Sequence, residues 1–296
     1  MKLTRWLGYA TVFLLLAEAA EAHAQAPSFA TIGDELAGDG AYLVDNVQLD
    51  FEDIVTSPRY LTSPDSLPGS ANFYLGLVGV GVLFAGAFAL DQTMKTRIGD
   101  MSHGAHDVME NFSYVTLIST LGFSYLYGLY DQDSALRQDL LTGGEAAGIG
   151  VLFNLATKAS FGRLRPYQNG SHTAFFHGAG GFNTRSFTSN DMVIETAMAT
   201  GLSEYFGNAW YVSVPLYSLA LLEGFTRIGS GQQWFSDVVA GSLLGWGTAE
   251  LLLWLHQRHS EEPTRWRIVP IAPPPAAARG GATALSSVGF GALYTW

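Results

Sequence analysis

The most informative segment of this chain is KASFGRLRP, residues 158–166, which combines a lysine, two arginines and a proline. Two polar segments follow it: SFTSND at residues 186–191 and TRIGSGQQWFSD at residues 226–237. Lysine supplies a point charge and arginine a planar fork, and these are the side chains that bind phosphate oxygens. A local group of cations in a chain of formal net charge −11 predicts a site for a small anionic ligand.

The composition excludes one class of partner. Binding to nucleic acid needs clustered lysine and arginine, whereas this acidic chain has lysine only at positions 2, 95 and 158. His103, His106 and Asp107 could share a helix face and suggest a metal, but their spacing identifies no third or fourth ligand. We therefore expect no nucleic acid partner, no metal and no cofactor.

The first 24 residues have the pattern of a secretory signal peptide. Lys2 and Arg5 precede the apolar run Trp6–Ala17, and Ala22-His23-Ala24 offers a small-x-small cleavage site. A transmembrane anchor is the alternative, but the apolar run is shorter than the ~20 residues that span a bilayer. The pattern predicts export to the periplasm or cell envelope.

The rest of the sequence divides into three parts. Residues 25–70 are acidic and rich in turn-forming residues, which predicts an extended lead-in with one short helix near Asp50–Ile54. Residues 71–260 form the predicted helical domain. Residues 261–296 are a tail rich in proline and glycine, into which one β-hairpin fits.

Long apolar runs and no alternation of strands with helices predict a mainly α fold, a bundle of six or more helices. We expect a shorter amphipathic helix within Asp91–Glu110. The longer expected helices are Phe73–Leu90, Phe112–Tyr130, Leu136–Phe161, Met192–Phe206, Trp210–Phe225 and Val238–His256. Carboxylates in lipid are costly, so the glutamates of the later helices favour either a soluble bundle or a membrane bundle with its acids inside. Of these two, we expect membrane association.

The three polar segments resemble the signature of the type-2 phosphatidic acid phosphatase and vanadium haloperoxidase superfamily. That signature reads Lys-x6-Arg-Pro, then Pro-Ser-Gly-His, then Ser-Arg-x5-His-x3-Asp. In this chain Asp191 and Gln233 stand at the positions of the two histidines, Thr188 at the position of the proline, and Asn190 at that of the glycine. The resemblance extends over roughly residues 73–256 and is specific in spacing.

The resemblance implies roles for the residues that match. Lys158, Arg165 and Arg227 would hold the phosphate oxygens, and Ser189 and the backbone N–H of Asn190 would complete the phosphate-binding site. Independently of the family, Ser189 or Asn190 is a suitable N-cap for a helix beginning near Met192, and helix N-termini favour anions.

The family's reaction uses one histidine to protonate the leaving group and another to attack phosphorus, oriented by the aspartate at the position of Asp237. A carboxylic acid at Asp191 is a conceivable proton donor, whereas the amide of Gln233 is neither nucleophilic nor titratable. His172 or His177, in the glycine-rich segment between the first two motifs, is an alternative source of an imidazole.

Three functional hypotheses follow. The first is an exported, membrane-associated protein of the cell envelope that keeps a pocket for a phosphorylated lipid or small phosphate ester but has lost or altered histidine chemistry. The second is an active phosphatase, hydrolysing a phosphoric monoester or a lipid pyrophosphate, with Asp191 as general acid and a nucleophile other than histidine. The third is an architectural or interaction module of the envelope whose cations form internal ion pairs. These hypotheses differ on whether the chain is an enzyme.

Overall fold

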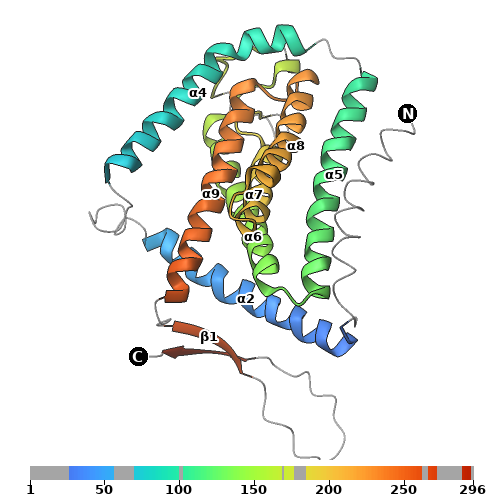
Figure 1. Ribbon diagram of the computed structural model, residues 1–296. Coiled ribbons are helices and arrows are strands. Elements are labelled where there is room, and N and C mark those ends of the chain that lie inside the picture. Colours follow the sequence, from blue (N-terminus) through green and yellow to red (C-terminus); the bar gives the residue numbers. More distant parts are fainter. Residues whose placement is uncertain are drawn as a thin grey trace, which may run out of the picture.

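The computed structural model describes residues 27–56, 70–99, 103–168, 170–176, 185–261, 266–271 and 289–294. Within these ranges the chain forms seven α-helices and two strands (Figure 1). The mainly α helical bundle expected from the sequence is confirmed. The predicted signal peptide lies outside the described residues.

The helices run nearly without interruption through the described residues. They are α2 (Phe29–Thr56), α4 (Ser70–Ile98), α5 (His103–Tyr130), α6 (Ser134–Phe161), α7 (Asn190–Tyr205), α8 (Trp210–Gly229) and α9 (Phe235–Glu261), with a short 3-10 helix η1 at Pro166–Gln168. The last four α-helices lie within a few residues of the expected ranges, although α9 extends further at both ends. Strands β1 (Trp266–Ile271) and β2 (Gly289–Tyr294) pair antiparallel, as the predicted hairpin requires.

Helix α7 lies at the centre of the bundle, where it packs against α6, α8 and α9 (Figure 1). Glycines allow two of these contacts to be close. A Cβ on Gly201 would lie 2.5 Å from the carbonyl oxygen of Asp139 in α6, and one on Gly245 would lie 2.3 Å from that of Val193. Because no side chain fits at these points, the backbone of α7 lies directly against its two long neighbours.

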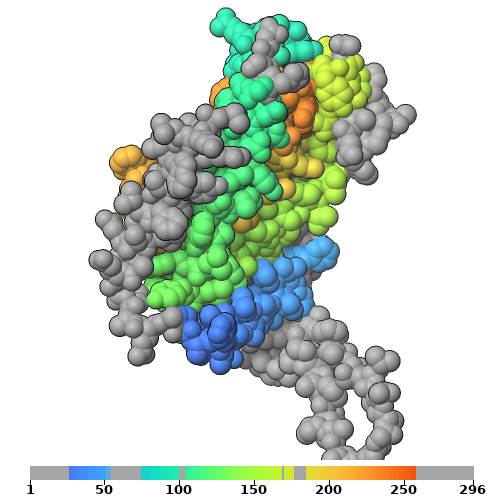
Figure 2. Space-filling view, turned by 90° about the vertical axis from the view of Figure 1, so that its right-hand side faces the viewer, coloured from blue at the N-terminus to red at the C-terminus, as the bar shows by residue number. Residues whose placement is uncertain are grey.

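The prediction of an extended lead-in is wrong, because residues 29–56 form the single long helix α2. This helix packs against α6, α5 and α9, and it lies across one end of α5 and α6 (Figure 2). The acidic residues that suggested a solvated segment are partners of the bundle. The buried Arg137 of α6 pairs with Glu35 and donates from Nε to both oxygens of Asp39, at 2.9 and 3.1 Å.

The separate short helix expected within Asp91–Glu110 is also absent from the described residues. Helix α4 continues through Asp91 to Ile98, and α5 begins at His103. The charge at Asp91 suggested the end of an apolar helix. In the structure its carboxylate is buried and accepts hydrogen bonds from Arg163 and Ser236, so the helix need not end there.

Within the described ranges, three helices are long and apolar enough to cross a membrane: Leu75–Ile98, Ser134–Phe161 and Phe235–Gln257. The first of these buries little of its surface within the protein, and its Leu75, Val78 and Val82 side chains are each at least 62% exposed. Apolar side chains in such numbers on an outer surface are typical of contact with lipid. The helices therefore indicate membrane association, with Glu145, Glu195 and Glu223 buried inside the bundle.

Candidate functional site

The three polar segments meet at one end of the bundle. The ammonium group of Lys158 on α6 donates to the carbonyl oxygen of Thr188, which precedes α7. The N–H of Ser189 donates to the carbonyl oxygen of Asp237 on α9, at 3.1 Å. The guanidinium of Arg165 donates to the carbonyl oxygen of Gln232, at 3.1 Å. Residues about 70 positions apart in the sequence thus share one site, as their motif spacing predicts.

Lys158 and Asn154 shape the loop that leads into α7. The Lys158 ammonium, almost fully buried, also donates to the carbonyl oxygens of Arg185 and Ser186, both at 3.3 Å. One turn earlier on α6, the Asn154 side chain accepts from the N–H and the hydroxyl of Thr188 and donates to its carbonyl oxygen. Asn154 therefore fixes the residue that stands where the family has proline.

Arg165 keeps a spare donor. Its Nε is buried and has no hydrogen-bond partner among the described residues. Burial lowers the pKa of this guanidinium, and the positive charge of Arg227 lowers it further, against the opposing effect of Asp191 and Asp237. Lys158 is also close enough to interact electrostatically with Arg165 and Asp191. The three cations expected at the site therefore do come together.

Arg227 is already surrounded by acidic groups. Its Nε lies 2.7 Å from Glu223 and 3.2 Å from Asp191, and a terminal nitrogen lies 3.2 Å from Glu110 of α5. Its other terminal nitrogen donates to the side-chain oxygen of Gln232, at 2.9 Å. A phosphate group at this arginine would have to compete with Asp191, the most exposed of the three carboxylates.

The first turn of α7 has the predicted cap. Ser189 is its N-cap, and the Ser189 hydroxyl accepts from the N–H of Met192 at 3.5 Å. The side-chain oxygen of Asn190 accepts from the Asn154 amide. This arrangement leaves the positive end of the helix, including the backbone N–H of Asn190, next to the cations.

The surroundings of Asp237 differ from what a catalytic histidine would need. Its carboxylate is fully buried, accepts from Arg163 at 2.5 Å and accepts from the N–H of Trp234 at 2.9 Å. Arg163 also donates to Asp91 of α4, at 2.5 Å. Within the described part of the chain, no hydrogen bond joins Asp237 to the Gln233 side chain. Asp237 therefore holds α9, α4 and the first motif together.

Gln233 lies at the site as a buried, neutral side chain. It is 3% exposed, its N–H donates to the carbonyl oxygen of Arg227 at 3.1 Å, and its side-chain oxygen has no hydrogen-bond partner among the described residues. An amide in this place can accept or donate a hydrogen bond but cannot attack phosphorus.

No histidine in the described residues takes the vacant role. The His172 ring packs between the rings of Phe88 and Trp234, with centroids 5.2 and 6.2 Å away, and His177 lies outside the described residues. The Nδ1 atom of His106 lies 3.4 Å from Glu110, the same glutamate that reaches Arg227. His106, Asp107 and Glu110 therefore extend the acidic network around Arg227.

Sequence reasoning missed three important residues here. Arg163 was present in the first motif, between the two cations of the family signature, but its spacing carried no signal of a partner. Asp91 and Asn154 lie within apolar helices and outside the motifs, Asn154 one turn before Lys158. The only sign of their importance in the sequence was a charged or amide side chain within an apolar run. Such a side chain indicates a buried polar contact but does not indicate which residue it contacts.

Comparison with known proteins finds similarity over part of the chain. A family model described as the PAP2 superfamily matches residues 140–261, which contain all three motifs. The lipid A 1-phosphatase of Porphyromonas gingivalis is 31% identical over 196 residues, which cover 64% of this chain but only 39% of that relative. Among solved structures, a transmembrane PAP2-type phosphatidylglycerolphosphate phosphatase from Bacillus subtilis matches 62% of this chain and 96% of its own, with 18% identity and a TM-score of 0.44.

The family match covers the same helices, α6 to α9, that bring the motif residues together. The matched segment contains the motif residues Lys158, Arg165, Arg227 and Asp237. Residues 140–261 of this chain therefore match the PAP2 superfamily.

Proposed function

We propose that this protein is an exported, membrane-associated member of the PAP2 superfamily that binds phosphorylated lipids and has lost the histidine chemistry of phosphate transfer. One observation carries the proposal. The Asp237 carboxylate, which would orient a nucleophilic histidine, is bound by Arg163, and the side chain four positions before it is the amide of Gln233. Neither part of a nucleophile and its orienting acid is therefore in place.

The cations support retained binding of a phosphate group. A phosphate monoester carries about 1.5 to 2 negative charges near neutral pH and accepts several hydrogen bonds. Arg165 has a buried donor without a partner, Lys158 and Arg227 lie within electrostatic range of it, and the N-terminus of α7 adds its dipole. Such a site stabilises a bound phosphate without any chemical step.

The exposed apolar helices favour a lipid as the carrier of that phosphate. The matched relative is named for the removal of a phosphate from lipid A. Here α4, α6 and α9 are apolar enough to cross a bilayer, and the first motif begins in the last turn of α6. We infer that the ligand is a phosphate ester at the headgroup of a membrane lipid, bound near the membrane surface.

Titration tests the binding. Short-chain phosphatidic acid would be titrated into the purified protein in detergent, with phosphatidylcholine of the same chain length as the control lipid. Replacing Arg165 by alanine removes a charge-assisted donor worth about 1.5–3 kcal/mol, so we expect affinity to fall roughly 10- to 150-fold. Arg97→Ala, at an exposed arginine of α4, is the matched control. Equal binding of both lipids by the wild type would refute the proposed ligand.

Release of inorganic phosphate tests the loss of chemistry. Loss of a nucleophile commonly removes about 10^4 to 10^6 in rate, so we expect no measurable turnover by the wild type. Turnover that disappears in Arg227→Ala would overturn this part of the proposal and favour the active phosphatase with Asp191 as general acid. Turnover only in the double variant Gln233→His and Asp191→His would show that the nucleophile is what is missing.

The acidic contacts of Arg227 favour a second candidate, an architectural module of the envelope. Glu110, Glu223 and Asp191 place three carboxylates around one guanidinium, and this satisfies the charge of Arg227 without a ligand. In that case Arg165→Ala would leave phosphatidic acid binding unchanged, while Arg227→Ala would destabilise the fold. Titration of Arg165→Ala with phosphatidic acid and thermal unfolding of Arg227→Ala therefore separate the candidates.

A further inference from the structure

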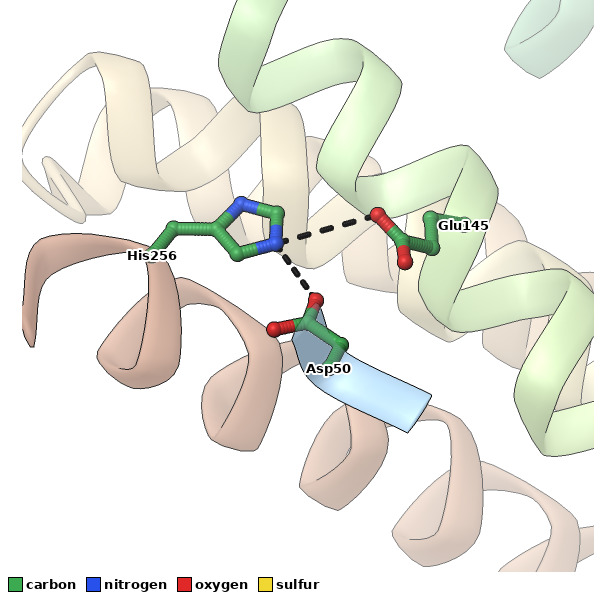
Figure 3. Close-up of side chains that lie close together, drawn as sticks. All are labelled: Asp50, Glu145 and His256. Atoms are coloured by element: carbon green, nitrogen blue, oxygen red, sulfur yellow. Dashed lines mark hydrogen bonds and ion pairs between the residues drawn. The ribbon is translucent and has the colours of Figure 1, made fainter. Parts of the chain in front are cut away.

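A second cluster of polar side chains lies far from the phosphate site. Asp50 of α2, Glu145 of α6 and His256 of α9 turn toward one another between the three helices (Figure 3). Lys158 follows Glu145 by 13 positions of the same helix, which separates the two by about 20 Å along α6. Asp50 also lies outside the segment that matches the family. The cluster is therefore a feature of this chain separate from the phosphate site.

The three side chains offer a compact set of metal ligands. The His256 Nε2 atom lies 2.5 Å from an oxygen of Asp50 and 3.7 Å from an oxygen of Glu145, and all three candidate ligand atoms lie within 4.8 Å of one another. A tetrahedral ion with bonds of about 2.1 Å holds its ligands about 3.4 Å apart. The Glu145 distance already fits, and the Asp50 carboxylate would need to move by about 1 Å.

The state of Glu145 points independently to a ligand. Its side chain is 2% exposed, its oxygens accept no hydrogen bond from a backbone N–H or a cationic side chain among the described residues, and its polar neighbours are the Asp50 carboxyl group and the His256 ring. Figure 3 shows the carboxylate directed at the His256 ring. A buried carboxylate without a hydrogen-bond donor is costly, and a bound cation is one of the few groups that satisfies it.

The Nδ1 side of the His256 ring contacts two hydroxyl groups, as the non-ligating nitrogen of a metal-bound histidine commonly contacts a polar group. The His256 Nδ1 atom lies 2.8 Å from the Tyr42 hydroxyl and 3.0 Å from the Thr142 hydroxyl. A hydrogen bond from Nδ1–H to either oxygen leaves the lone pair on Nε2, the atom that faces the two carboxylates. Such outer contacts fix the tautomer and the ring orientation of a ligating histidine.

We propose that Asp50, Glu145 and His256 bind one divalent transition-metal ion of the Zn²⁺ or Mn²⁺ type. One imidazole nitrogen and two carboxylate oxygens suit these ions, whereas Mg²⁺ prefers oxygen and water alone. The ion holds α2 against α6 and α9, and it takes no part at the phosphate site. Its role is to attach the N-terminal helix to the bundle.

Zinc titration of the full chain tests the site. The chain is purified in detergent, stripped with a chelator, and titrated with Zn²⁺, Mn²⁺ and Mg²⁺ by calorimetry and thermal unfolding. We expect one Zn²⁺ per chain, a rise in Tm on zinc binding, and no such rise with Mg²⁺. Glu145→Gln and His256→Gln should abolish the rise in Tm, and Tyr42→Phe should weaken binding about tenfold by removing an outer contact. Asp45→Asn, at an exposed aspartate of α2, should bind as the wild type does.

Two results would overturn the proposal. Zinc binding that persists in both Glu145→Gln and His256→Gln would place the ion elsewhere, for example at His106, Asp107 and Glu110. A wild type that binds no Zn²⁺ or Mn²⁺, together with a Glu145→Gln variant that is more stable than the wild type, would show that a proton and not a metal satisfies the two carboxylates. Circular dichroism of each variant confirms that its helices are intact before titration.

Discussion

Arg163 gives the sharpest test of what holds the phosphate-site end of the bundle together. Its side chain and those of Asp91 and Asp237 are each 0% exposed, and the guanidinium lies 2.5 Å from each carboxylate. It also donates to the Ser236 hydroxyl and to the carbonyl oxygen of His172. One cation therefore compensates two buried anions that come from α4 and α9.

Replacing Arg163 by methionine keeps much of the side-chain volume and removes the charge. Both carboxylates would then be buried without their cation, and breaking a buried pair in this way costs about 3–5 kcal/mol. That is a large part of the 5–15 kcal/mol that stabilises a typical domain. For a helical domain of this size, the loss corresponds to a fall in Tm of roughly 6 to 20 °C.

Thermal unfolding in detergent, followed by circular dichroism, measures this fall. Arg97→Met, at an exposed arginine of α4, is the matched control and should change Tm little. Adding Asp91→Asn and Asp237→Asn to Arg163→Met removes the uncompensated charges, so the triple variant should regain part of the lost stability. A Tm of Arg163→Met within about 2 °C of the wild type, or a triple variant less stable than the single one, would contradict this role of Arg163.

Three further predictions concern the same scaffold. Asn154→Ala should cost about 2–3 kcal/mol, measured by thermal unfolding, and weaken phosphatidic acid binding, since its amide holds the loop before α7 through three bonds to Thr188. Gly245→Ala should lower stability by about 1–3 kcal/mol in the same measurement, because its Cβ would lie 2.3 Å from the Val193 carbonyl oxygen; an unchanged Tm would contradict the close packing of α7 on α9. Arg137→Met should speed hydrogen exchange of α2 more than that of α7, because it releases the carboxylates that tie α2 to α6; equal protection of α2 in both proteins would disprove this.

The helices that carry the motifs were predictable because their apolar runs are long and because capping and turn-forming residues stand at their ends. Ser189 was expected to cap α7, and it does. The meeting of Lys158, Arg165 and Arg227 followed from the family spacing, because only a folded bundle brings such distant positions together. At the phosphate site, the helices predicted from the apolar pattern and the contacts predicted from the motif spacing are therefore consistent.

Helix α2 was not predictable by the same reasoning. Its glycines and acidic residues predicted a solvated, turn-rich segment. The sequence gives the position of each charge but not the residue with which that charge pairs in the fold. Arg137, about 100 positions away, is what makes Asp39 suitable for a helix packed on the bundle. The metal-type cluster was hidden for the same reason: Asp50 and His256 are separated by 206 positions.

The backbone of the loop that precedes α7 is held independently of the residues at the catalytic positions. Donors from α6, at Lys158 and Asn154, fix its backbone, whereas the side chains of Asp191 and Gln233 supply none of the bonds that hold it. The residues that set the shape of the site are therefore separate from those that would perform its chemistry. A lineage with this arrangement can exchange its reacting groups while the surrounding backbone keeps its form, so loss of catalysis need not carry loss of the protein with it.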